Sequence, residues 1–188
     1  NQLDRQSKEK QEGLSRVPDE LISLNELRRI SVPLYGMTRW GDLFTPRQAL
    51  TLSVISGLVR DVGDDLRSTE SPEFAAAVTT ILALAVDRLA DISNSLCRWK
   101  PTMSQAINLF GRQAIPMMWD FAETSPLSEA AGDLATTTAN MIRVLQRETV
   151  LQNPGHVRAC TATQHPLPDD SAAAFVTDPP YYDAVPYA

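Results

Sequence analysis

The chain has few of the residues that build metal centres and disulfide frameworks. Its 188 residues include two histidines and two cysteines, Cys97 and Cys160, which are far apart in the sequence. No Cys-x-x-Cys spacing is present, so the sequence indicates neither a zinc site nor a disulfide scaffold, and we predict no metal. Free thiols are typical of reducing compartments, and we therefore expect a cytoplasmic protein.

The chain also lacks a long apolar run. The longest apolar stretch, at about 75–85, is interrupted by Thr79 and Thr80, whereas a membrane-spanning helix needs about 20 apolar residues. The N-terminus is polar and charged, without the apolar segment of a signal peptide. We therefore predict no contact with a membrane.

Basic residues are outnumbered, since 17 Lys and Arg against 23 Asp and Glu give a net charge of -6. This balance excludes a domain that binds nucleic acid mainly through overall phosphate neutralisation, so any DNA contact must be local or come from other segments. Five basic residues and two tryptophans form either such a local patch or, as the acidic total favours, an ordinary surface with the aromatic rings in the core. They are Arg39, Trp40, Arg47, Arg98, Trp99, Lys100 and Arg112.

Residues 1–44 are predicted to form a charged tail and an irregular packed segment, and residues 45–154 a helical region of about four helices. Thr45 and Pro46 supply a cap and a first helical residue for the first helix. Its apolar stripe is Leu50, Val54, Ile55, Leu58 and Val62. The second helix begins at about Pro72 and runs to Leu96, and its many Ala and Leu residues predict a central, largely buried helix.

The third predicted helix begins near Thr102 or Ser104. It presents Ile107, Phe110, Ala114 and Met118 at helical spacing, with Pro116 expected to kink or end it. The fourth follows Ser125-Pro126 and ends at Asn153-Pro154-Gly155, with Leu134, Met141, Ile142 and Leu145 on one face. Together these helices are expected to form a layer.

The pattern changes in residues 155–188. Residues 157–163 are rich in short and β-branched side chains, 166–171 form a turn, and 172–177 are a short continuous apolar run. Such a run is typical of a strand buried on both faces of a parallel sheet. We therefore predict an α/β fold, with two strands here. Because two strands are too few for a stable parallel sheet, we expect the chain to be part of a longer protein.

The four residues Asp178-Pro179-Pro180-Tyr181 follow the second predicted strand, where ligands of open α/β sheets bind. The exocyclic amine of a nucleic-acid base is a poor nucleophile, because its lone pair is drawn into the ring. The Asp178 carboxylate and the Pro179 carbonyl can each accept one amino hydrogen, and consecutive prolines fix the direction of the carbonyls. Tyr181 offers a flat face to a base flipped from the duplex, and Tyr182 and Asp183 adjoin the same predicted substrate site.

With these residues the sequence resembles the amino-methyltransferases that carry an Asp-Pro-Pro-Tyr motif. It is similar in particular to the large adenine-specific DNA methylases with an N-terminal domain of unknown function. The resemblance covers roughly residues 17–188, through 35–37, 41–48, 96–99, 111–114, 119–121, 166–171, 175–183 and 185–188. It implies a Rossmann-like sheet, incomplete in this chain, S-adenosylmethionine as cofactor, and DNA as partner.

Two features depart from the pattern of these enzymes. Thr161 stands where many of them have an acidic residue near the adenine of the cofactor, and the eight glycines form no Gly-x-Gly. The sequence therefore assigns no cofactor-binding residue, and the cofactor half is expected outside this chain.

The sequence thus predicts part of a DNA methyltransferase that modifies the exocyclic amine of a flipped base, most simply adenine N6. We expect the full-length enzyme to be active and this part alone to be inactive. Two alternatives stay open. One is an amino-methyltransferase that acts on RNA or on protein glutamine, and the other is a non-catalytic helical interaction module.

Overall fold

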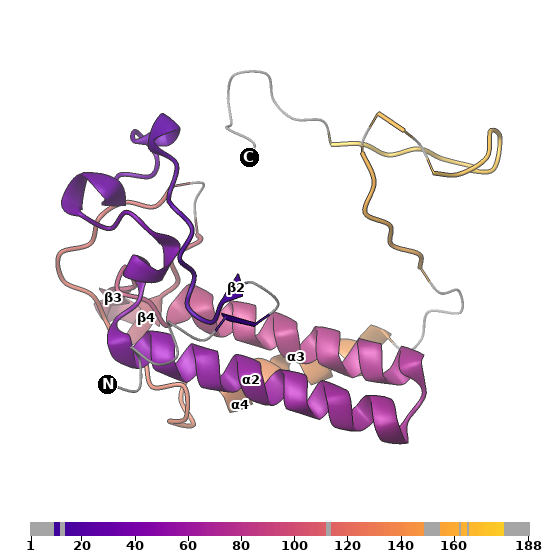
Figure 1. Cartoon of the computed structure of the whole chain (residues 1–188), viewed down its shortest axis with the longest axis horizontal. Coiled ribbons are helices and arrows are strands. Elements are labelled where there is room, and N and C mark those ends of the chain that lie inside the picture. Colours follow the sequence, from indigo (N-terminus) through magenta and orange to yellow (C-terminus); the bar gives the residue numbers. More distant parts are fainter. Residues whose placement is uncertain are drawn as a thin grey trace. The chain divides into compact units, whose positions relative to one another are not determined.

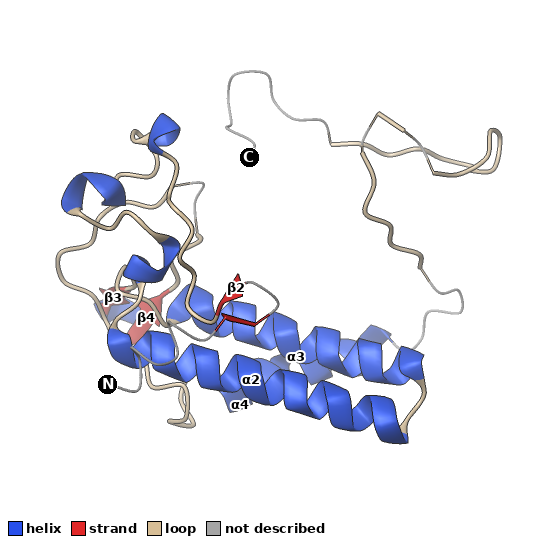
Figure 2. Cartoon of the chain, in the orientation of Figure 1, coloured by secondary structure: helices blue, strands red, loops and turns tan. Residues whose placement is uncertain are grey.

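The computed structural model describes residues 10–11, 14–111, 114–148, 155–161, 163–164 and 166–178 (Figure 1). The chain divides into two compact units, residues 1–145 and 146–188. The described residues combine three long helices with short antiparallel strand pairs, so the chain is a mixed α and β protein (Figure 2). Within this described part, no helix is both long and apolar enough to cross a membrane.

Helix α2, Pro46–Thr69, begins where the sequence predicts. Thr45 Oγ1 accepts a hydrogen bond from the Gln48 N–H at 3.3 Å, and Gln48 Oε1 accepts one from the Thr45 N–H at 2.8 Å. Two backbone donors that a helix start leaves without helical partners are thus satisfied reciprocally. The predicted helix start is confirmed.

Helix α3, Pro72–Ile92, is capped by Ser71, whose hydroxyl accepts from the Phe74 N–H at 3.2 Å. It ends four residues before the predicted Leu96. The Asn94 side chain donates to the carbonyls of Ala90 and Asp91, at 2.9 and 3.1 Å, and so occupies acceptors of the last turn. This side-chain capping ends the helix within the polar run Ser93-Asn94-Ser95.

Helices α2 and α3 are joined through Glu70 and Ser71 and pack side by side as a hairpin (Figure 1). Gly63 permits the close approach, because a Cβ there would lie 2.9 Å from Thr79 Oγ1. The expectation that α3 is largely buried is wrong. Its buried residues are Ala75, Ala85, Leu89, Asp91 and Ile92, and the rest of the helix is half-buried or exposed.

The third predicted helix is wrong as well. In its place are β3, Arg98–Lys100, a 3-10 turn, Pro101–Met103, and β4, Gln105–Ile107, which form an antiparallel hairpin with Trp99 opposite Ala106. Ser104, in the left-handed conformation (φ 49°), reverses the chain. The Asp91 carboxylate then accepts the Phe110 N–H at 2.8 Å, so a long-range hydrogen bond takes a donor that a helix would have used.

Helix α4, Leu134–Glu148, confirms the fourth predicted helix but begins later than Pro126. Its cap is Asp133, whose carboxylate accepts the Thr136 N–H at 2.7 Å. Gly132 precedes it in the left-handed conformation (φ 92°), where a Cβ would lie 2.6 Å from Ile92 Cδ1. The helix therefore starts where a carboxylate can cap it and only a glycine fits before it.

A separate hydrophobic cluster lies where residues 22–44 meet residues 96–118. Its segments include the 3-10 helices Leu24–Glu26, Val32–Tyr35 and Trp40–Leu43, and a bridge joins Ile30 to Ile115. Residues 22–44 thus pack as short 3-10 helices joined by irregular chain. Strands β1, Lys10–Gln11, and β2, Leu14–Ser15, pair before it. The buried members of the cluster are Ile22, Val32, Leu43, Leu96, Leu109 and Ile115.

In the second unit, the predicted turn at 166–171 is present, since the Ser171 N–H donates to the Pro168 carbonyl at 3.4 Å. The two predicted strands are absent from its described residues, because 155–161 and 172–178 are irregular and exposed. A strand needs at least one hydrogen-bonded neighbour, and none of the described residues of this unit supplies one. The chain as it stands therefore has no Rossmann-like sheet in its described part.

Candidate functional site

Asp178 is the first residue of the predicted amine-binding loop, and the structure places it in an exposed position. Its carboxylate is open to solvent at the end of the irregular segment 172–178. The other predicted site residues, Pro179, Pro180, Tyr181, Tyr182 and Asp183, lie outside the described residues. Of the predicted site, the structure thus presents the acceptor carboxylate alone.

The apolar residues just before Asp178 are exposed rather than buried. Phe175 is 73% exposed and Val176 is 91% exposed, although both were predicted to lie inside a sheet. The turn that precedes them is held locally, with the Ser171 hydroxyl donating to the Pro168 carbonyl at 2.6 Å. The segment therefore brings Asp178 to the surface together with apolar side chains that no sheet covers.

The described residues of 146–188 do not fit a cofactor such as S-adenosylmethionine. They contain one glycine, Gly155, and no atom lies within 4 Å of a Cβ placed there. These described residues therefore form no glycine-rich loop of the kind that binds a cofactor. Thr161 is exposed, and its hydroxyl pairs with that of Thr163 at 3.1 Å. No contact to the cofactor is therefore assigned to these residues. Nor do the described residues of the whole chain hold a cluster of three or more His, Cys, Asp or Glu side chains suited to a metal ion.

The basic and aromatic residues that sequence reasoning grouped as a nucleic-acid patch are divided in the structure. Trp40 is partly buried against the hydrophobic cluster, as the alternative interpretation expects. Arg39 donates to the Asp19 carbonyl, and Arg112 lies outside the described residues. On β3, in contrast, Arg98, Trp99 and Lys100 are all exposed, with Trp99 on the face opposite to the two cations.

Arg47 belongs to a polar site that the sequence did not predict. Its Nη2 and Nε donate to the two oxygens of Glu123, at 2.5 and 3.2 Å. The hydrogen bond from Arg47 holds the pKa of Glu123 below its ordinary value, and the same pair raises the pKa of Arg47. The two residues are 76 positions apart, and only the fold brings them together.

This ion pair lines a cavity of about 400 Å³ with Gln48, Ser93 and Thr124. Gln48 is buried and uses Oε1 in the helix cap, which leaves its Nε2 without a hydrogen-bond partner in the described structure. Most of its lining residues are polar, and its guanidinium is already neutralised by a carboxylate. It can hold a small polar group, and its carboxylate is already engaged by Arg47.

Asp91 is a second polar centre that the sequence did not reveal, because two of its partners, Asn108 and Phe110, are 17 and 19 positions away. Its carboxylate accepts from Arg88 at 2.5 Å, from the Asn108 side chain at 3.1 Å and from the Phe110 N–H at 2.8 Å. Nearby, Cys97 is fully buried, and burial raises the pKa of its thiol. Both residues therefore serve the fold rather than chemistry, since a protonated buried thiol is a poor nucleophile.

No protein-family model, curated protein or solved structure matches the chain.

Proposed function

We propose that residues 166–183 carry the amine-binding loop of a Rossmann-like, S-adenosylmethionine-dependent DNA methyltransferase. Its substrate is the exocyclic amine of a flipped base, adenine N6. The proposal places the reaction in a longer protein that contains this chain and acts on DNA in the cytoplasm, and it treats this part alone as inactive.

The observation that carries the proposal is an exposed carboxylate followed at once by two prolines and a tyrosine. Asp178 is open to solvent, so a substrate amine can reach it. A specified string with two prolines arises by chance in roughly one chain of this length in a thousand. In the proposed site, Asp178 and the Pro179 carbonyl accept the two amino hydrogens. This favours a pyramidal nitrogen whose lone pair is available for attack, while Tyr181 stacks on the base.

The exposure of Phe175 and Val176 also supports the proposal. Fully burying side chains of this size stabilises a protein by about 1.5–3 kcal/mol each. Strands from elsewhere in the enzyme would gain that stabilisation by covering the segment, and Asp178 would then lie at the carboxyl end of a central strand. S-adenosylmethionine would supply the methyl group, and its binding residues are assigned to none of the described chain.

The test uses the full-length protein that contains this chain. Wild-type protein is incubated with DNA and methyl-labelled S-adenosylmethionine, and the DNA is digested to nucleosides. We expect labelled N6-methyladenine, and we expect Asp178→Ala to remove the label while the far-ultraviolet circular dichroism stays unchanged. Asp169→Ala is the matched control, because Asp169 is an exposed carboxylate of the preceding turn and should retain activity.

Three outcomes distinguish the alternatives. Label in N4-methylcytosine, in RNA or in a protein glutamine keeps the loop's role and changes the substrate. Full activity in Asp178→Ala rules out the assigned role of the carboxylate. If neither this chain nor the full-length protein binds S-adenosylmethionine in calorimetry, the second candidate function holds, a non-catalytic helical interaction module. The apolar surface exposed on α2 and α4 favours that second candidate.

A further inference from the structure

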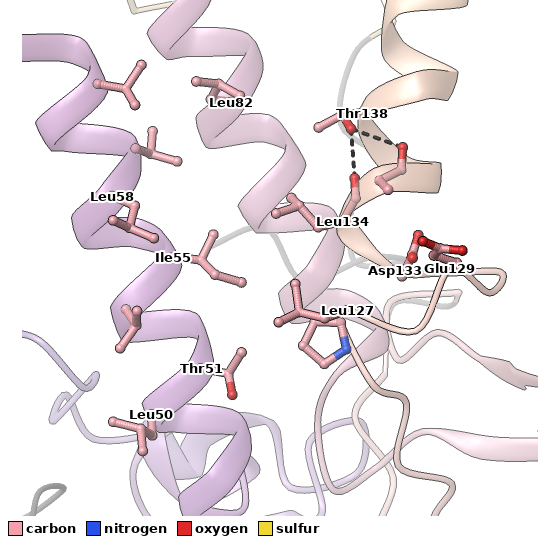
Figure 3. A pocket seen from close by; sticks show the side chains of 15 residues that line it. Leu50, Thr51, Ile55, Leu58, Leu82, Leu127, Glu129, Asp133, Leu134 and Thr138 are labelled. Atoms are coloured by element: carbon pink, nitrogen blue, oxygen red, sulfur yellow. Dashed lines mark hydrogen bonds between the residues drawn. The ribbon is translucent and has the colours of Figure 1, made fainter. Parts of the chain in front are cut away.

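An apolar groove runs between helix α2 and the start of helix α4. Its volume is about 780 Å³, and in Figure 3 the side chains of α2 face those of residues 127–138 across it, with Leu82 of α3 between them. Most of its lining is aliphatic, and the two charged residues that line it are Glu129 and Asp133. The groove-lining residues of α2 are Leu50, Thr51, Val54, Ile55, Leu58, Val59 and Val62.

The groove is open because α4 does not pack closely against either α2 or α3. Of the apolar stripe on α2, Ile55 is buried. Val54 remains 43% exposed and Leu58 57% exposed, and Leu127 on the opposite side is 76% exposed. Side chains of this kind, gathered on one surface, mark a site of association rather than an ordinary solvated face.

The apolar surface continues along α4 beyond the groove. Leu134 and Thr138 line the groove, and Met141, Ile142 and Leu145 follow on the same face at helical spacing. Ile142 is 51% exposed and Leu145 is 47% exposed. The same chain therefore carries both an open apolar groove and a helix face of matching character.

The charges of the two surfaces are complementary. Helix α4 carries Arg143 and Arg147, and its one acidic residue, Glu148, is its last. Arg143 is exposed and donates to Asn140 at 2.7 Å, without an ion pair in the described part of the chain. On the groove, Asp133 caps α4, whereas Glu129 is exposed and likewise has no ion pair among the described residues. An unpaired cation on α4 thus matches an unpaired anion beside the groove.

We propose that the groove binds α4 of a second copy of this chain, so that the protein forms a symmetric dimer. In a two-fold dimer the same patch serves both subunits, and each α4 lays Ile142 and Leu145 into the groove of the other copy. Arg143 then lies near Glu129 of the second copy. This inference is independent of the methyltransferase function, because it uses residues 50–145 alone.

The test measures the mass of the full chain by sedimentation equilibrium between 1 and 200 µM. We expect wild type to approach twice the chain mass of 20.7 kDa. Leu58→Glu in the groove and Ile142→Glu on α4 are both changes at exposed positions, and each should raise the dimer dissociation constant by at least about 100-fold, because burying an unpaired carboxylate is strongly unfavourable. Leu84→Glu on α3 is the matched control. Leu84 is 48% exposed and does not line the groove, so its dimer should persist.

A charge reversal supplies a second readout that does not depend on packing. Glu129→Arg and Arg143→Glu should each weaken the dimer about 10-fold, because each places like charges opposite one another. The double variant should recover most of the affinity, because it places opposite charges there again. Circular dichroism checks that every variant is folded. A monomeric wild type at 200 µM overturns the proposal. The groove would then be left for a different protein. A dimer that both Leu58→Glu and Ile142→Glu leave intact overturns it as well.

Discussion

Replacing Asp91 by Ala should loosen the junction between α3 and the segment that follows β4. The carboxylate is one of the few buried charged groups in the described structure, with 12% of the side chain exposed. The change removes an acceptor from the Asn108 side chain and from the Phe110 N–H. It leaves the Asp91 backbone carbonyl in place, which still accepts from the Leu109 N–H at 2.9 Å.

The size of the effect follows from these contacts. A hydrogen bond to a charged acceptor contributes about 1.5–3 kcal/mol, and two are lost here. The ion pair with Arg88 adds little, because the Arg88 side chain is 51% exposed. Removing the carboxylate also removes the cost of its desolvation, which offsets part of the loss. We therefore expect Asp91→Ala to lower the free energy of unfolding by about 2–4 kcal/mol.

The assay is urea unfolding followed by tryptophan fluorescence. With a slope of about 1–3 kcal/mol per molar urea, the midpoint should fall by roughly 1–2 M. Asp87→Ala is the control, since Asp87 lies one turn earlier on α3 and is exposed. It should change the free energy of unfolding by less than about 0.5 kcal/mol. If the two variants unfold at the same urea concentration, the carboxylate of Asp91 does not hold this junction.

Three further substitutions test local features. Ser71→Ala removes the cap of α3 and should cost about 1 kcal/mol, measured by thermal unfolding. Arg47 lowers the pKa of Glu123, so the ionised pair stabilises the fold above about pH 4.5 and loses this effect as the pH falls. Glu123→Gln should therefore flatten the loss of stability as the pH falls below about 4.5, and an unchanged acid profile would contradict the assignment. Gly132→Ala forces a side chain into a left-handed residue and against Ile92, and its free energy of unfolding should fall by about 1–3 kcal/mol; wild-type stability would show that the turn relaxes.

The parts of the fold that were predicted correctly depend on signals within a few residues. Thr45 with Pro46 and Ser71 with Pro72 begin their helices through contacts no more than three residues away. The prediction of the third helix was wrong because the hydrogen bond that replaces the helical one joins residues far apart in the sequence. The acceptor for the Phe110 N–H is Asp91, 19 positions earlier, and helical spacing carries no information about such a bond.

The candidate sites likewise divide into features that a short stretch of sequence reveals and features that depend on distant residues. The string at Asp178 is readable in the sequence, but a continuous apolar run predicts a buried strand only where neighbouring strands exist. The groove was missed because the stripe at Val54 and Leu58 identifies the apolar face of a helix without saying whether another element covers it. The pair of Arg47 and Glu123 depends on the path of the chain between them, which no spacing rule encodes.

The two-residue connection between α2 and α3 also has a consequence for the order of folding. The hairpin is built from segments adjacent in the sequence, so closing its loop costs little entropy. The hydrophobic cluster instead joins residues 22–44 to residues 96–115, with the whole hairpin inserted between them. Contacts that close short loops generally form faster than contacts that close long ones. We therefore expect the hairpin to form first. Once formed, it holds the two halves of the cluster near each other and lowers the entropy cost of joining them.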